Sequence, residues 1–272
     1  MKKNYRIIQK YLNYVFIKII SFFLEKLNYK TTPSLAKIDK FDFNYSEKTR
    51  RLVFNNSKEK FGKIIVDTSL FNSELCEIGK NHNTNKSPYN LDGHRSGYTG
   101  FYYLLFSQLK KKELKIAEIG IEKNASTKLW RKYFDNAEIH TFEYDKTKIE
   151  NALKDNLKNT YYHEINVDDQ SSIKESFEKI NKKFDVIIDD STHIFDHQIN
   201  IIYNAMNYIN ENGILIIEDI YKHRKDYEEE KYYKKILPIK DNFKNIFFVE
   251  TPHINNFTAS WKNEKLLILI KK

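Results

Sequence analysis

Acidic residues follow two neighbouring apolar runs in the second half of the chain, and a histidine lies beside them. The segment FDVIIDDSTH places Asp190 and His193 three positions apart, and GILIIED places Glu218 and Asp219 after the next apolar run. Because neighbouring parallel strands end at the same edge of a sheet, three carboxylates and one imidazole are expected to converge there. Like charges at close range repel one another, and oxygen ligands suit Mg²⁺. We therefore expect a magnesium site formed by Asp190, Glu218 and Asp219.

Such a site predicts chemistry on a hydroxyl group. A bound cation would hold two oxygens of a vicinal diol and lower the pKa of one hydroxyl, and His193 would accept its proton, with Asp190 beside it. Each residue also has a structural alternative: Asp190 could cap the helix that follows, Glu218 and Asp219 could be solvated loop acids, and His193 could be a structural histidine. Their joint position at two strand ends favours the catalytic interpretation.

Polar residues after earlier apolar runs predict a nucleotide-type cofactor at the same edge of the sheet. The run KIAEIG brings Glu118 and Gly120 to the point where a cofactor would approach the backbone, and Ser126 opens the helix that follows. About 20 residues further on, Glu143 ends the run IHTFE, and its carboxylate could accept hydrogen bonds from two ribose hydroxyls. The cofactor-binding residues expected here are Glu118, Gly120, Ser126, Glu143, Asp169 near an adenine, and Asp189.

This first loop has a single glycine, which argues against NAD as the cofactor, because the pyrophosphate of NAD needs close backbone approach at several glycines. A cofactor without phosphates fits the loop better. The structural alternative is an ordinary strand-to-helix turn that carries solvated acids.

The segments between these residues alternate regularly in their hydrophobic pattern. Short runs rich in Ile and Val predict strands at 115–120, 138–143, 160–165, 184–189 and 213–218, and amphipathic segments predict helices at 125–135, 146–157, 170–181 and 194–210. This order indicates a doubly wound, mostly parallel sheet. After a charged helix at about 222–236, runs at 245–250 and 265–270 should pair antiparallel. We expect an α/β, Rossmann-like fold of seven strands with an antiparallel C-terminal strand and an N-terminal helical extension.

Charge and cysteine content narrow the partners and the compartment. The formal net charge is +9, but residues 1–30 hold seven Lys and Arg against one Glu, which gives +6 and leaves only +3 for the rest. Without a basic stripe on the remaining chain, nucleic acid is not an expected partner. Cys76 is the single cysteine and cannot form an internal disulfide, so we expect a cytoplasmic location.

The first 30 residues place apolar side chains at helical spacing, interrupted by Lys18 before the stretch is long enough to cross a bilayer. We expect an amphipathic helix that lies peripherally at the inner face of the membrane. The alternative is packing against the body of the protein or a second subunit of a homo-oligomer. Residues 31–74 are interpreted as a linker and N-terminal extension, and residues 75–272 as the catalytic domain.

Residues 75–272 resemble class I S-adenosylmethionine-dependent methyltransferases, specifically the metal-dependent sugar O-methyltransferases of macrolide biosynthesis. AEIGI with ASTKLWRKYF resembles the first motif of that family, DDSTH its D-D-G-S-H, and IIED its acid pair; HNTNKS resembles a G-T-D-K-type segment, and DGHRSGYTGFYYLLF the aromatic helix over the cofactor. Asn124 departs from the family, which commonly has glycine there.

The resemblance implies a Rossmann-like methyltransferase fold, S-adenosyl-L-methionine and Mg²⁺ as cofactors, and methyl transfer to a hydroxyl of a sugar or other vicinal diol. It assigns Asp190, Glu218 and Asp219 to the metal and His193 to the general base. The expected partner is a small-molecule or glycan acceptor. Two alternatives stay open: an NAD(P)-dependent oxidoreductase on the same fold, and a non-catalytic, membrane-associated binding module.

Overall fold

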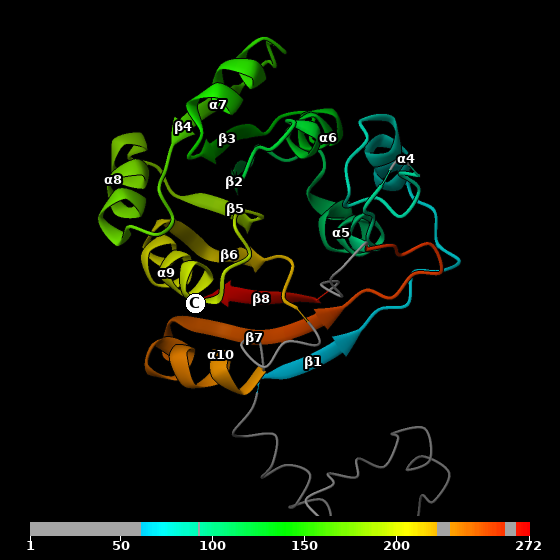
Figure 1. Ribbon diagram of the computed structural model, residues 1–272. Helices are drawn as coiled ribbons and strands as arrows, with labels where there is room; N and C mark the ends of the chain where they lie inside the picture. Colours follow the sequence, from blue (N-terminus) through cyan, green and yellow to red (C-terminus); the bar gives the residue numbers. More distant parts are fainter. Residues whose placement is uncertain (1–60, 92, 222–228, 259–264) are drawn as a thin grey trace, which may run out of the picture. The chain divides into compact units, whose positions relative to one another are not determined.

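A twisted sheet with helices on both faces organises the described part of the chain (Figure 1). The computed structural model describes residues 61–272 except 92, 222–228 and 259–264. The amphipathic helix expected at 1–30 and the linker up to residue 60 lie outside these residues. Among the described helices, none is long and apolar enough to span a membrane.

The sheet contains eight strands in the described residues, in the order β1-β7-β8-β6-β5-β2-β3-β4. Their bounds are β1 Gly62–Ile65, β2 Lys115–Ile119, β3 Glu138–Glu143, β4 Thr160–Glu164, β5 Phe184–Asp189, β6 Ile209–Ile217, β7 Phe243–Glu250 and β8 Lys265–Lys271. All neighbours are parallel except β8, which is antiparallel to both β6 and β7. The expected mostly parallel sheet and the antiparallel pairing of the last two strands are confirmed.

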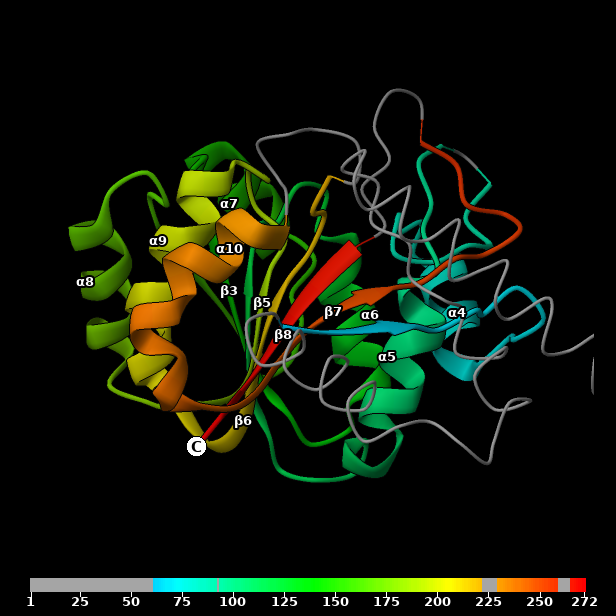
Figure 2. The same cartoon turned by 90° about the horizontal axis from the view of Figure 1, so that it is seen from below.

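Helices cover the two faces of the sheet over two hydrophobic cores. Their bounds are α4 Glu74–Asn81, α5 Tyr98–Phe106, α6 Ala125–Tyr133, α7 Lys146–Leu153, α8 Gln170–Ile180, α9 Phe195–Ala205 and α10 Glu229–Ile236. Figure 2 shows α4, α5 and α6 on one side of the sheet and α8, α9 and α10 on the other. The central strands are apolar on both faces: in β5, Val186 and Ile188 join the core under α5 and α6, and Ile187 joins the other.

The structure differs from the expected fold at one edge. The count of seven strands was one too low, because β1 pairs in parallel with β7 inside the segment expected to be an extension. The sequence of β1, GKII, lacks the apolar alternation that marks a half-buried strand, and all four of its residues are exposed.

Two boundaries inside the sheet also differ from the expectation. The helix expected at 194–210 ends at Ala205, and β6 begins at Ile209, earlier than the expected strand at 213–218.

Candidate active site

The carboxyl ends of β2 and β5 form the point at which strand order reverses. From β2 the chain continues to β3 and β4 on one side, while β5 and β6 lie on the other. Ligands of open α/β sheets bind in the crevice at such a point. A cavity of about 270 Å³ lies there, lined by residues that include Gly120 after β2, Glu143 at the end of β3, Val167 after β4, and Asp190 after β5.

Gly120 brings the loops after β2 and β5 into direct backbone contact. Its amide donates to the Phe142 carbonyl at 2.8 Å, and the Asp190 amide donates to the Ile119 carbonyl at 2.8 Å. The φ of Gly120 is +105°, and an added Cβ would lie 2.1 Å from the Asp190 carbonyl oxygen. Only glycine fits this position, because a side chain would be strained and would collide with backbone.

Backbone amides of the loops after β2 and β3 hold Glu143 at the end of β3. One carboxylate oxygen accepts from the amide of Ile121 at 3.1 Å, and the other accepts from the amides of Tyr144 at 2.9 Å and Asp145 at 3.2 Å. A carboxylate has about four lone-pair sites, so Glu143 can still accept from a ligand in the cavity that it lines. Its predicted contact with ribose stays a prediction.

The other residues expected at the cofactor do not line this cavity in the described structure. Ser126 is buried in the first turn of α6, and Asp169 is exposed and caps α8 by accepting from the Ser171 amide at 2.9 Å. Asp189 is buried and accepts from the Ser191 hydroxyl at 2.6 Å. Burial raises the pKa of Asp189 to about 6. Their roles toward the cofactor stay predictions.

The expected convergence of acids occurs at the ends of β5 and β6. These strands are parallel neighbours in which Asp189 is in register with Ile217, so Asp190 lies beside Glu218 and Asp219. The Nε2 atom of His193 lies 3.5 Å from Asp219 Oδ2 and 3.9 Å from Asp190 Oδ1. Asp190, His193 and Asp219 each offer a ligand atom, and these atoms lie within 4.8 Å of one another. This donor set fits one divalent cation.

The structural alternatives do not hold for these acids. Glu218 is 1% exposed and Asp219 is 5% exposed, so neither is a solvated loop acid. Asp190 does not cap α9, whose N-cap residue is Ile194. Burial raises the pKa of both Glu218 and Asp219, and the negative charge of Asp190 acts in the same direction. Positive charge nearby is therefore needed to keep them ionised.

Lys86 supplies part of that charge, and sequence reasoning did not assign it a role. Its ammonium lies 2.5 Å from Asp190 Oδ2, 2.6 Å from Glu218 Oε2 and 3.7 Å from Glu118 Oε1, and the residue is 1% exposed. Burial would lower the pKa of Lys86, but the carboxylates of Asp190, Glu218 and Glu118 outweigh it and hold the pKa above its ordinary value. The only sequence signal was its position in HNTNKS, within the family resemblance.

Two tyrosines of α5 complete the acidic end of β6. Tyr102 donates to Glu218 Oε1 at 2.6 Å, and Tyr98 donates to Asp219 Oδ1 at 2.8 Å. Both tyrosines are buried, and burial, followed by the neighbouring carboxylates, raises the pKa of both phenols. The aromatic segment expected to cover the cofactor therefore fixes the carboxylates through its hydroxyl groups.

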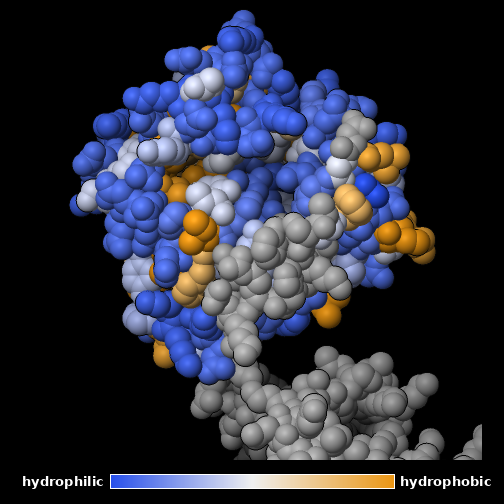
Figure 3. All heavy atoms as spheres, in the orientation of Figure 1, coloured by the Kyte–Doolittle hydropathy of each residue, from blue (hydrophilic) through white to orange (hydrophobic). Residues whose placement is uncertain are grey.

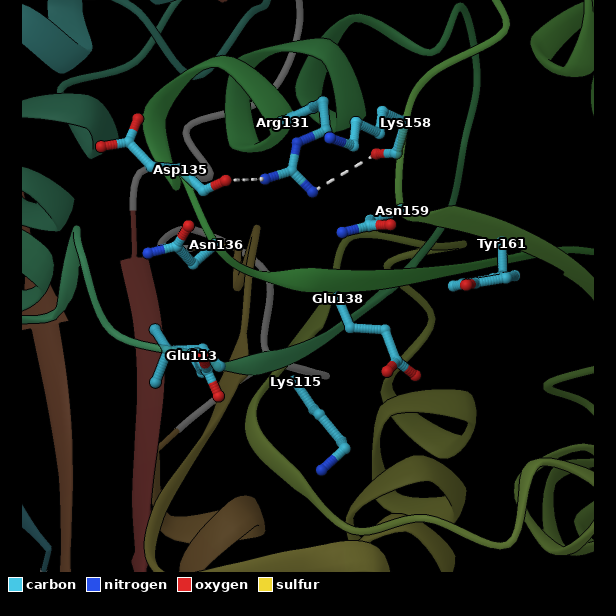
Figure 4. Close-up of a pocket in the computed structure, with 10 residues that line it drawn as sticks. Glu113, Lys115, Arg131, Asp135, Asn136, Glu138, Lys158, Asn159 and Tyr161 are labelled. Atoms are coloured by element: carbon cyan, nitrogen blue, oxygen red, sulfur yellow. Dashed lines mark hydrogen bonds between the residues drawn. The ribbon is translucent and has the colours of Figure 1, made fainter.

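A larger cavity of about 510 Å³ lies at the opposite, amino edge of β2 and β3 (Figure 4). Its wall mixes both charges, including Lys115, Arg131 and Glu138. The Arg131 guanidinium is engaged by backbone carbonyls, among them those of Ala137 and Phe134, so its role is structural. None of the residues expected in the active site lies here.

The strand order and the antiparallel β8 define the Rossmann-like fold of class I methyltransferases. No family model matches the chain. The chain is 26% identical over 133 residues to an 8-demethyl-8-(2-methoxy-alpha-L-rhamnosyl)-tetracenomycin-C 3'-O-methyltransferase of Streptomyces olivaceus, an alignment that covers 46% of this chain and 32% of that protein. This chain thus spans about a third of the curated relative it matches.

Solved structures give the same fold. The MycE methyltransferase of the mycinamycin biosynthetic pathway, in complex with Mg, SAH and mycinamycin VI, aligns with a TM-score of 0.55 and 15% identity over 74% of this chain and 55% of that chain. An O-methyltransferase of Bacillus cereus in complex with SAH aligns with a TM-score of 0.51 and 14% identity, over 74% and 92%. The predicted resemblance to class I methyltransferases is confirmed in the fold.

Proposed function

We propose that this protein is an S-adenosylmethionine-dependent O-methyltransferase that uses Mg²⁺. One observation carries the proposal: Asp190 both lines the cavity at the strand switch point and belongs to the cluster with His193 and Asp219. A methyl donor in the cavity would therefore face a hydroxyl held at the cluster. The curated relative and the structural neighbours, which are named as methyltransferases, support this choice of chemistry.

The residues around the cavity would bind the methyl donor. Gly120 lines the cavity, and Glu143 would accept hydrogen bonds from ribose hydroxyls there. Glu118, Ser126, Asp169 and Asp189 retain their predicted supporting roles on the cofactor side. The donor, when bound, supplies an electrophilic methyl group on a sulfonium.

The acidic cluster would bind and activate the acceptor. Asp190 and Asp219 would hold the Mg²⁺, and a bound cation would lower the pKa of a coordinated hydroxyl. The Nε2 atom of His193, 3.5 Å from Asp219, would accept the hydroxyl proton as the oxygen attacks the methyl group. The face of the molecule in Figure 3 is mostly hydrophilic.

The acceptor is proposed to be a sugar or another vicinal diol. The relative in Streptomyces is named for methylation of a rhamnosyl compound, and the MycE structure contains mycinamycin VI. A cytoplasmic location is proposed because the lone Cys76, which is buried, forms no disulfide.

Calorimetry with S-adenosylmethionine tests the proposal. We expect saturable heat with S-adenosylmethionine and with S-adenosylhomocysteine, and none with NADH, which the oxidoreductase alternative requires. Mass spectrometry should then detect a gain of one methyl group on a diol acceptor only when Mg²⁺ is present. Absence of heat at high protein concentration would contradict the proposal, and cofactor binding without turnover on any diol would favour the binding module.

A further inference from the structure

The hydrogen bonds of the acidic cluster divide its carboxylate oxygens into two groups. Glu218 accepts from Tyr102 on Oε1 and from Lys86 on Oε2, at 2.6 Å each, and is 1% exposed. Asp190 accepts from Lys86 on Oδ2, and Asp219 accepts from Tyr98 on Oδ1. The two remaining oxygens, Asp190 Oδ1 and Asp219 Oδ2, are those that face His193.

The geometry points to Lys86 as a positioning residue that withdraws Glu218 from the metal and turns Asp190 toward it. This inference rests on the proposed function. Lys86 and Tyr102 occupy both oxygens of Glu218, whereas Lys86 takes only one oxygen of Asp190, so the cation should bind between Asp190 Oδ1 and Asp219 Oδ2. The ligand set is then Asp190 and Asp219 with His193 adjacent, and Glu218 acts only through Lys86.

The excess of negative charge around Asp190 and Asp219 favours the binding of one cation between them. Four acids, Glu118, Asp190, Glu218 and Asp219, surround the site, and Lys86 neutralises one negative charge from inside the protein. The backbone of Lys86 is also fixed, because its carbonyl accepts a hydrogen bond from the Thr99 amide, in the first turn of α5, at 3.0 Å. The same turn of α5 carries Tyr98. Lys86, which orients Asp190, and Tyr98, which orients Asp219, are therefore linked to each other through the backbone of α5.

A pair of neighbouring substitutions tests which acid binds the cation. Mn²⁺ serves as the probe, and its affinity for the full chain is measured by electron paramagnetic resonance without substrate. Asp219→Asn should weaken Mn²⁺ binding by more than about tenfold, whereas Glu218→Gln should change it by less than about threefold. The amide oxygen of Gln can still accept from Lys86 while its nitrogen donates to the Tyr102 oxygen. Equal losses in the two variants would overturn the inference.

A double variant tests the positioning of Asp190. Lys86→Met with Glu218→Gln removes one positive and one negative charge, so the net charge is unchanged, although the buried Glu118 also loses its ion pair with Lys86. We expect Mn²⁺ affinity about 10–100-fold below that of Glu218→Gln alone, because Asp190 loses its anchor. An affinity equal to that of Glu218→Gln would overturn the role of Lys86. Lys265→Met is the matched control, since Lys265, on β8, is a buried lysine paired with Glu229 of α10.

Thermal unfolding of each variant separates this effect from misfolding. For the double variant we expect a transition that is still cooperative but has a lower Tm than the wild type, because Glu118 loses its ion pair. If the wild type binds S-adenosylmethionine but no Mn²⁺, the inference fails while methyl transfer survives. If the wild type binds Mn²⁺ as inferred but no S-adenosylmethionine, the proposed function fails while the metal site survives.

Discussion

At the scale of single residues, Gly120 and Asp190 connect the two halves of the site. Gly120 has no Cβ, and the backbone of Asp190 fills the space where one would be. The same Asp190 presents its carboxylate to Lys86 on one side and to His193 on the other. A change at Gly120 should therefore disturb both the cavity and the acidic cluster.

Gly120→Ala should lower the free energy of unfolding by about 3 kcal/mol, because the new methyl meets the Asp190 carbonyl at a left-handed φ. Differential scanning calorimetry should show a loss in Tm of roughly 6–12 °C. Gly93→Ala is the matched control, since its Cβ would meet nothing within 4 Å. Equal Tm values for the two variants would contradict the predicted clash between the new methyl group at position 120 and the Asp190 carbonyl.

His193→Asn should remove the proposed general base without changing the fold. His193 has a φ of 57°, a conformation that Asn adopts readily, so Asn is a better replacement than Ala. We expect kcat for methyl transfer to fall by about 10²–10⁴-fold, with little change in the Kd of S-adenosylmethionine. His82→Asn, at the end of α4, serves as the control. Retained kcat in His193→Asn would exclude the base role.

At the scale of elements, β3 and β4 are joined by a pair of histidines away from the site. His140 Nδ1 lies 2.8 Å from His163 Nε2, and His140 Nε2 lies 2.6 Å from Glu138. Burial, and then the neighbouring His140, lowers the pKa of His163 to about 4. The folded protein therefore favours neutral His163. Its stabilising contribution is complete above about pH 6.5 and is lost as the pH falls through about 4.

His163→Gln should reduce the dependence of Tm on pH in that window. Gln can still hydrogen-bond to His140 but does not titrate. The ring is partly exposed, so after allowance for solvent screening we expect the variant to lose about 1 kcal/mol less stability than the wild type, or roughly 2–4 °C in Tm. The measurement is Tm between pH 7 and pH 4, with both proteins in the same buffers. If the plots of Tm against pH ran parallel for the two proteins, His163 would not be the group that titrates in this window.

The elements that follow a simple hydrophobic rule could be predicted from sequence. The strands at 138–143 and 184–189 match β3 and β5 residue for residue. For β5 the reason is that a central strand buried on both faces reads as a nearly continuous apolar run. The exposed β1 has no such pattern. In the site, convergence of Asp190 and Asp219 follows from strand order alone. The ion pair of Lys86 with Asp190 joins residues 104 positions apart, and no local pattern encodes that distance.

At the scale of the whole molecule, most of the net positive charge belongs to the first 30 residues of the sequence. Residues 1–30 carry +6 of the net +9. A peripheral membrane contact through these residues remains a prediction, with packing against the protein as its alternative.

Removal of residues 1–30 should abolish sedimentation with anionic liposomes. The full chain is expected to pellet with vesicles rich in anionic lipid, and to do so less at high salt, because basic residues interact with the negative surface potential. We expect the bound fraction of the shortened chain to fall at least about tenfold. Vesicles of neutral lipid are the control. Equal sedimentation of the two chains would favour packing against the protein.

The place of β8 also constrains how the chain assembles during synthesis. β8 lies between β6 and β7, although both are translated before it, and β1 joins the sheet only through β7. Until residues 265–271 leave the ribosome, β6 has an open edge and β1 and β7 have no partner that connects them to the rest. Nascent chains paused before this point should therefore depend on chaperones to cover that edge.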